Sequence, residues 1–370
     1  MRRIGHVAGD PTETDRSGEN PDIAAHQHDW CGHACAMCHD EDRRPRHVAM
    51  LVVDGVRTLD VTGPLEVFDA ARALGCAYTV TLHACGDRST VRCSSGLSFD
   101  AEPATALPPT VDTLLISGGA SLVSDGVPHS LRHLVRTQAA GARRVASVGT
   151  GAFALAAAGL LDGRRATTHW RQLDAFTARH PSVLVERESV YTRDGDVWTS
   201  AGAEAGIDLA LALVADDHGA GVAQEISKDM VVLTRRLEGH PQLSAAARTP
   251  RPKHDGLERL MATVAVDPAG HYEMDTVAAQ LGMSPRHLAR LFKAQVGVTL
   301  RQYVYEVRLE NAVGLMLAGE SFHAAASRSG LRYGARIRDH LEAHRDLPAR
   351  GLSGLLVDSR GAEAVSVNAG

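Results

Sequence analysis

The turn Val148-Gly149-Thr150-Gly151 lies between an apolar run and an alanine-rich segment, within residues 143–161. A sharp turn between a strand and a helix is where many α/β enzymes hold a nucleophile. A nucleophile needs a reactive oxygen, sulfur or nitrogen atom that a neighbouring base or a lowered pKa activates. The apex of this turn carries neither serine nor cysteine. The turn therefore indicates either an enzyme site that has lost its reactive atom or a site that never had one.

A second group of reactive side chains lies near the N-terminus. Cys31, Cys35 and Cys38 stand close together in a segment that is also rich in histidine. Thiolates and imidazoles at short spacing can bind zinc, and clustered thiols can act as a redox switch. Incidental cysteines in a polar tail give the same pattern. These readings stay open, and we expect no bound cofactor.

Charge and hydropathy exclude several classes of protein. The 370 residues carry a net charge of −5, so binding to DNA would need a local basic face. The chain has no run of about 18 apolar residues and no apolar secretory signal, so we expect no membrane contact. Six unevenly spaced cysteines in so long a chain do not form a secreted disulfide framework. We therefore expect a cytoplasmic protein.

The first half of the chain alternates between apolar runs and helical patterns. Strands are predicted at 47–55, 77–86, 112–120 and 144–148. Helices are predicted at 62–74, 129–141, 151–161 and 204–217. This alternation predicts a mostly parallel sheet with helices on both faces.

Three local features refine this half. The first helix is expected to begin at Thr62 or Gly63, with Pro64 in its first turn. Residues 183–202 predict a hairpin, because two β-rich runs flank Asp194-Gly195. The other three cysteines lie on or near strands and are expected to be small core residues: Cys76, Cys85 and Cys93.

Residues 238–256 are rich in proline, alanine and glycine without periodicity, which predicts a linker. Helical patterns alone follow, so a separate all-α domain is expected. Asp275 is predicted to cap a first short helix, and Gly282 to form a turn. Ser284-Pro285 is predicted to start a second helix.

The second of these helices has one apolar and one basic face. Its apolar face is expected to hold Leu288, Leu291 and Phe292. Its exposed face is expected to hold Arg286, His287, Arg290 and Lys293. In a helix-turn-helix unit, side chains near the start of the second helix reach base edges in the major groove. Arg286, His287 and Arg290 are therefore candidates for base contacts, with Ser284 and Lys293 beside them. A helical bundle with solvated charges gives the same spacing.

The segment LGMSPRHLARLFKAQVGVTLRQYVYEVRLENAVGLM resembles AraC/XylS-type transcription regulators. That family carries two helix-turn-helix units joined by a long helix, which the resemblance places at Leu300–Leu317. The second unit would lie at 321–348, where Asp339 stands at a position that is often arginine. The resemblance implies base reading mainly by the first unit. Arg336 and Arg338 would contact phosphates or, weakly, bases.

Three segments of the first half resemble the PfpI-type domain of the class I glutamine amidotransferase-like superfamily. They are VDGVRTLDVTGPLEVFDAA, LLISGGA and VASVGTGAFALAAAGLLDGRRATTHW. The resemblance covers residues 47–225. In enzymes of that superfamily the turn after the central strand holds a cysteine, and that position is Gly149 here. The resemblance implies a ligand pocket made by Asp60, Gly118, Gly119, Gly149, Thr150 and His169.

Regulators that join these two domains in this order form the GlxA-like group. The expected fold is α/β plus all-α: a flavodoxin-like parallel sheet, then a helical domain with two helix-turn-helix units. The expected parts are a disordered extension (1–46), a PfpI-like domain (47–236), a linker (237–256), a DNA-binding domain (257–352) and a disordered tail (353–370).

The two resemblances together predict a sequence-specific DNA-binding transcription regulator. Double-stranded promoter DNA and a second copy of the chain are the expected partners. RNA polymerase and a small-molecule effector are further candidates. Because glycine cannot attack a substrate, we expect no catalysis, and a role for the α/β domain in sensing, dimerisation or as a scaffold. Two alternatives stay open: an amidase or hydratase of PfpI type, and a metal or redox sensor that acts through the N-terminal cysteines.

Overall fold

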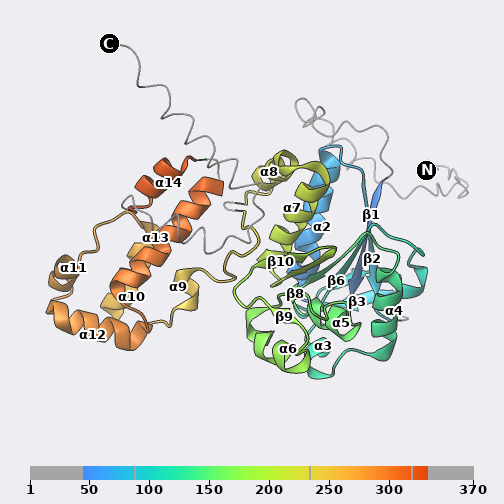
Figure 1. Ribbon diagram of the computed structural model, residues 1–370, viewed down its shortest axis with the longest axis horizontal. Helices are drawn as coiled ribbons and strands as arrows, with labels where there is room; N and C mark the ends of the chain where they lie inside the picture. Colours follow the sequence, from blue (N-terminus) through green and yellow to red (C-terminus); the bar gives the residue numbers. More distant parts are fainter. Residues whose placement is uncertain (1–44, 87–88, 233–234, 318–319, 332–370) are drawn as a thin grey trace, which may run out of the picture.

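The computed structural model describes residues 45–86, 89–232, 235–317 and 320–331 (Figure 1). An α/β half comes first along the chain and a helical half follows it, which confirms the predicted fold class. None of the helices in these ranges is long and apolar enough to cross a membrane. Both predicted disordered ends, apart from residues 45 and 46, lie outside the described residues.

A seven-stranded sheet forms the centre of the α/β half. Its strands are β1 (Arg46–Val52), β2 (Tyr78–Ala84), β5 (Glu102–Pro103), β6 (Thr113–Ser117), β7 (Arg144–Val148), β10 (Tyr191–Asp194) and β11 (Val197–Ser200). Their order is β10-β11-β7-β6-β1-β2-β5. All neighbours are parallel except β10 and β11, which form the predicted hairpin. Two small sheets pair β3 (Thr90–Arg92) with β4 (Ser98–Asp100), and β8 (Arg165–Ala166) with β9 (Leu184–Val185).

Helices cover both faces of the sheet (Figure 1). One layer contains α2 (Thr58–Ala73), α7 (Glu204–His218) and α8 (Ala220–Asp229). The other contains α3 (Ser121–Ser124), α4 (His129–Ala139), α5 (Gly151–Ala157) and α6 (Leu173–Arg179). Met50 and Leu115 pack against the first layer, whereas Leu51 and Ile116 pack against the second, and all four are fully buried. The strands are therefore buried on both faces, which is why they read as continuous apolar runs.

The start of α2 differs from its prediction. The helix begins at Thr58 rather than at Thr62, and Pro64 lies inside it. Proline has no N–H, so the carbonyl group of Asp60, four residues earlier, loses its helical partner. The Ser117 hydroxyl group donates to that carbonyl oxygen at 3.0 Å. A residue at the end of β6 thus makes the internal proline tolerable.

The three described cysteines pack in or against the core of this half, as expected. Cys76 and Cys93 are buried, and Cys85 is half-buried. Burial raises the pKa of the Cys85 thiol to about 12. At neutral pH this thiol is protonated and a poor nucleophile.

A buried ion-pair network ties the amino ends of the strands to α7. The guanidinium of Arg144, which is 2% exposed, lies 2.5 Å from the Asp217 carboxylate. Arg143 donates to the same carboxylate at 2.7 Å, and so does the Tyr78 hydroxyl group at 2.7 Å. Burial and the Asp217 charge raise the pKa of Tyr78, so its hydroxyl group stays a donor. The network joins β2, β7 and α7.

The helical half contains α9 (Ala245–Arg248), α10 (Asp255–Val266), α11 (Met274–Gln280), α12 (Pro285–Val296), α13 (Leu300–Leu317) and α14 (Phe322–Arg328). The bounds of α13 match those predicted for the linking helix. The predicted linker, by contrast, contains α9 and the start of α10. Ser244 caps α9 by accepting the Ala247 N–H, and Ala245 is fully buried in the core of this half. The burial of Ala245 against distant residues thus orders a segment that lacks a local apolar pattern.

Asp217→Asn is expected to lower the free energy of unfolding by about 3 kcal/mol, because it leaves the buried Arg144 short of a negative partner. The matched change Asp216→Asn should cost less than about 1 kcal/mol, because that carboxylate is partly exposed and surface ion pairs are weak. Urea unfolding followed by tryptophan fluorescence measures both. Equal losses in the two variants would contradict the importance of the buried pair.

Candidate functional site

The turn between β7 and α5, which we call the elbow, brings Gly149 against Asp60 and Gly202. Gly149 has φ +58°, in the left-handed region that favours glycine. A Cβ atom added to Gly149 would lie 3.3 Å from Oδ2 of Asp60 and 3.6 Å from the Cα atom of Gly202. The Asp60 carboxylate therefore faces the space that a side chain at position 149 would occupy.

Asp60 is 7% exposed, and its carboxyl group holds the chain segment before α7. Its Oδ1 atom accepts a hydrogen bond from the Ala203 N–H at 2.6 Å. Ala203 has φ +52°, which is uncommon for a residue with a Cβ atom. Burial raises the pKa of Asp60, while the Ala203 N–H and the positive charge of Arg57 act in the opposite direction. The sequence prediction missed both Ala203 and Arg57, since neither carries a motif of its own.

Two glycines after β6 complete the floor of the elbow. The Thr150 hydroxyl group donates to the Gly119 carbonyl oxygen at 3.0 Å. A Cβ atom on Gly118 would lie 2.1 Å from the backbone nitrogen of Gly151, so only glycine fits there. The Gly118 N–H donates to the Val148 carbonyl oxygen at 3.2 Å. The Gly118 N–H is therefore already used within the protein.

His169 directly follows Thr168, a residue that contacts the elbow. The Thr168 hydroxyl group donates to the Gly149 carbonyl oxygen at 2.9 Å. Nδ1 of His169 accepts the Arg171 N–H at 3.3 Å. Burial, followed by the charges of Arg57 and Arg171, lowers the pKa of His169. The imidazole is thus neutral at neutral pH. The structure brings the six predicted pocket residues close together. That they form a ligand pocket stays a prediction.

The free energy of unfolding of the Asp60→Asn variant, relative to that of the unaltered chain, is expected to increase as the pH rises from about 4 to about 7. Burial keeps the folded-state pKa of Asp60 above the usual 3.8, so the folded chain keeps a proton that the unfolded chain has already lost. The stability that this proton contributes is complete below the unfolded pKa and is lost as the pH rises through the folded pKa. Urea unfolding at both pH values measures it. Asp174→Asn, at a side chain that is 92% exposed, is the control, and a pH-independent difference for Asp60→Asn would contradict the expectation.

The helix pair α11–α12 has most of its predicted features. Gly282 forms the turn with φ +65°. The Ser284 hydroxyl group accepts the His287 N–H at 3.3 Å and caps α12, with Pro285 at the first helical position. The cap prediction for α11 is wrong: its N-cap is Glu273, and Asp275 lies in the first turn, where a negative charge still favours the helix end.

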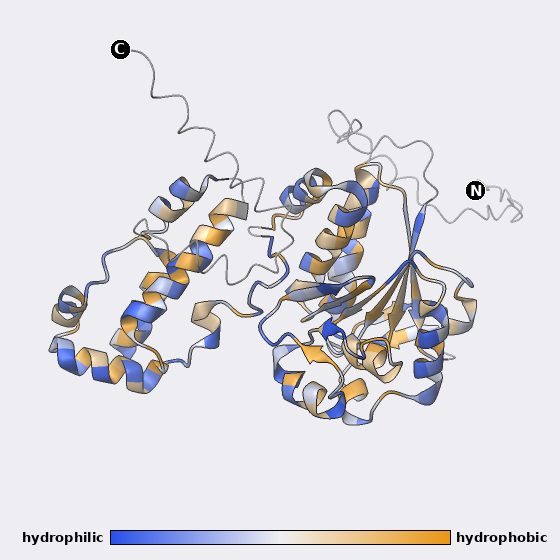
Figure 2. Cartoon of the chain, in the orientation of Figure 1, coloured by the Kyte–Doolittle hydropathy of each residue, from blue (hydrophilic) through white to orange (hydrophobic). Residues whose placement is uncertain are grey.

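The buried face of α12 fixes the direction of its basic face. Leu288 and Phe292 are fully buried and Leu291 is partly buried. Hydrophilic and hydrophobic residues alternate along α12 (Figure 2). The predicted contact residues are all exposed: Ser284, Arg286, His287, Arg290 and Lys293.

Other predicted positions lie outside the described residues: Arg336, Arg338, Cys31, Cys35 and Cys38. Of the second helix pair, the structure describes α14 and the turn at Gly330, with φ +69°. The described ranges hold no group of three or more His, Cys, Asp or Glu residues arranged to bind a metal.

Known protein families match both halves of the chain. Residues 46–216 match the DJ-1/PfpI family, and residues 277–350 match a helix-turn-helix domain family. Isonitrile hydratase from Pseudomonas putida is 36% identical over 180 residues, which cover 48% of this chain and 74% of that enzyme. The α/β half alone is long enough to account for these 180 residues.

Two relatives are regulators. The HTH-type transcriptional regulator CdhR from Pseudomonas aeruginosa is 31% identical over 235 residues, 62% of this chain and 68% of the relative. The HTH-type transcriptional regulator GlxA from Rhizobium meliloti is 28% identical over 280 residues, 75% of this chain and 85% of the relative. With the helix-turn-helix match, these similarities decide between a DNA-binding unit and an ordinary helical bundle. The chain belongs to the AraC-type DNA-binding transcription regulators that carry an N-terminal DJ-1/PfpI domain.

Proposed function

We propose that this regulator reads its promoter mainly through α12, and that its α/β half controls this binding without covalent chemistry. The observation that carries the first part is the exposed basic face of α12 next to a capped N-terminus. Residues at this end of the second helix reach base edges when the helix enters the major groove.

Residue types suggest how the contacts divide. Arg286 and Arg290 are four residues apart and share one helix face. Each guanidinium group can donate to both acceptors of a guanine, and His287 can reach a neighbouring base. Ser284 and Lys293 suit phosphate oxygens, which fix the register of the helix without reading sequence. Arg336 and Arg338 of the second unit are proposed as further phosphate contacts.

The α/β half is proposed to sense a small-molecule effector, to pair two copies of the chain, or to do both. The similarity to isonitrile hydratase makes an enzyme the alternative, and the Asp60 carboxylate beside Gly149 is the observation that favours it. Glycine supplies no nucleophile, however, and the thiol of Cys85 is held protonated. Binding without bond formation is the function that these residues support best. RNA polymerase is the further partner that promoter binding implies.

Arg290→Ala is expected to raise the Kd for a selected genomic fragment about tenfold, because one bidentate guanine contact is lost. Fluorescence anisotropy with the intact chain at moderate salt measures it. Binding to random DNA should weaken much less. Lys228→Ala is the control, since this lysine lies on α8 and pairs with Glu225. Equal weakening on both DNAs, or an unaltered chain without preference for any fragment, would contradict the proposal.

Gly149→Cys is expected to yield no turnover of an isonitrile or an amide. The new thiol would lie against the Asp60 carboxylate, whose negative charge disfavours the thiolate that attack requires. Iodoacetamide labelling across a pH series measures the pKa of the new thiol, in a background with the three tail cysteines changed to serine. That background with Gly149 retained is the control. Hydrolysis by the control would favour the enzyme alternative instead.

A further inference from the structure

Residues 235–249, which we call the strap, belong to both halves of the molecule. The first part of the strap is hydrogen-bonded to the α/β half. Its last part, α9, packs in the core of the helical half, where Ala245 is fully buried together with Leu257 and Tyr303. The strap therefore contacts both halves of the molecule.

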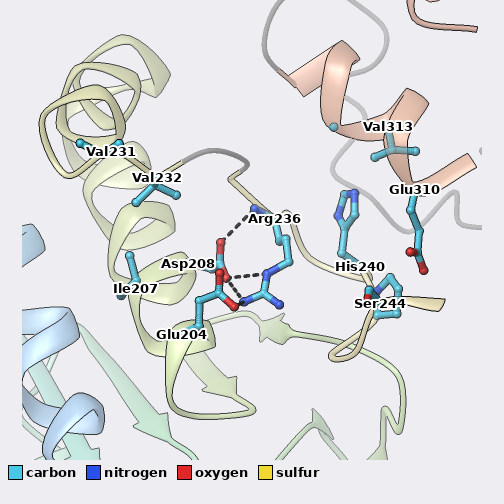
Figure 3. Close-up of a pocket in the computed structure, with 12 residues that line it drawn as sticks. Glu204, Ile207, Asp208, Val231, Val232, Arg236, His240, Ser244, Glu310 and Val313 are labelled. Atoms are coloured by element: carbon cyan, nitrogen blue, oxygen red, sulfur yellow. Dashed lines mark hydrogen bonds and ion pairs between the residues drawn. The ribbon is translucent and has the colours of Figure 1, made fainter. Parts of the chain in front are cut away.

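The first anchor of the strap is Arg236, which binds two acidic residues of α7. Its Nε and Nη2 atoms donate to Oδ2 of Asp208 at 2.9 and 2.7 Å, and its backbone N–H donates to Oδ1 at 2.9 Å (Figure 3). Asp208 is 2% exposed, and Glu204 lies 3.3 Å from the same guanidinium. Ala203, which precedes this helix, is hydrogen-bonded to Asp60 of the elbow. One helix thus touches the elbow at its start and the strap one turn later.

The second anchor is Gln242. Its Nε2 atom donates to the Thr168 carbonyl oxygen at 2.9 Å and to the Thr167 hydroxyl oxygen at 3.1 Å. Its backbone N–H donates to the Glu188 carbonyl oxygen at 2.7 Å. The hydroxyl group of Thr168 in turn donates to the Gly149 carbonyl oxygen. A single residue, Thr168, therefore separates Gln242 from the apex of the elbow.

The third anchor joins the strap to α13, the helix that links the two helix-turn-helix units. The Glu310 carboxylate accepts the Ala245 N–H at 2.8 and 2.9 Å. Arg248 donates to Glu306 at 2.8 Å and to Glu310 at 3.3 Å. Burial raises the pKa of Glu310, and its contacts with Ala245 and Arg248 oppose that rise.

A cavity of about 530 Å³ lies beside the strap. Ile207 on α7 and Val232 line one side, and Val313 on α13 lines the other, with His240 and Ser244 of the strap between them (Figure 3). The two halves face each other there across a hollow, while the strap supplies hydrogen bonds and ion pairs to both. The strap is thus placed to set the position of α13 relative to the elbow.

We infer that the strap couples the elbow to DNA binding, with Gln242 and Arg236 as its positioning residues. A change at the Gly149 turn shifts Thr168 and the start of α7, and both contact the strap. The strap then shifts α13 and with it the basic face of α12. Coupling of this kind is reciprocal, so bound DNA also biases the elbow. The inference rests on the proposed DNA reading by α12.

A double-mutant cycle on the intact chain tests the coupling. Thr168→Val removes the hydroxyl donor to Gly149 at nearly constant volume. In an otherwise unaltered chain it is expected to change the Kd for the selected genomic fragment by about fivefold or more. In a Gln242→Ala background the same substitution is expected to change Kd by less than about twofold. Thr177→Val is the matched control, because it removes a threonine hydroxyl that donates to a backbone carbonyl on α6.

The outcomes separate the inference from the proposed function. Equal fold-changes in both backgrounds, or no change with Thr168→Val, overturn the coupling while DNA binding by the unaltered chain still stands. An unaltered chain without specific DNA binding overturns the proposed function itself. A purely structural role for Gln242 would lower the melting temperature and leave the response to Thr168→Val intact. Gln242→Glu keeps the size, replaces the donating amide and should abolish the response in the same way.

Discussion

The close approach of Gly149 to Gly202 and Asp60 is the constraint on which the α/β half depends. A Cβ atom on Gly202 would lie 2.8 Å from the Cα atom of Gly149, so the turns after β11 and β7 meet backbone to backbone. Asp60 closes the third side and binds the Ala203 N–H. The turns after two neighbouring strands and the first helix therefore meet at one point.

That point determines what the α/β half can do. The left-handed backbone at Gly149 places residue 149 beside the buried carboxyl group of Asp60. Glycine leaves this geometry without a reactive atom. The turn also contacts the loop at Thr168, and Asp60 holds the segment before α7. In the coupling that we infer, these contacts connect the elbow to the DNA-binding half.

Local patterns in the sequence predicted the parts that local physics controls. The buried strands, the hairpin at Asp194-Gly195 and the cap at Ser284 follow from periodicity and turn chemistry. The bounds of α13 came from the family resemblance. The wrong predictions for the start of α2 and for the linker concern segments that depend on distant partners. Pro64 fits inside α2 because the Ser117 hydroxyl group donates to the Asp60 carbonyl oxygen, which the proline leaves without a helical partner. The same limit explains why Arg57 and Ala203 were missed.

The strap differs most from what the sequence predicted. Its proline, alanine and glycine content indicated a linker, yet Asp208, Thr168 and Glu310 hold it from three sides. Hydrogen bonds between residues 28 to 74 positions apart leave no periodicity in the chain, so composition alone cannot reveal them. The basic face of α12 is the opposite case, because a helix shows its two faces in its own spacing.

Selection of bound sequences from a random DNA library tests the central claim most directly. The intact chain is compared with the same chain carrying Arg286→Ala and Arg290→Ala. The account predicts a recurring motif for the unaltered chain, with guanines whose preference disappears in the variant. The same motif with the same guanines in both selections, or no motif from the unaltered chain, would contradict it.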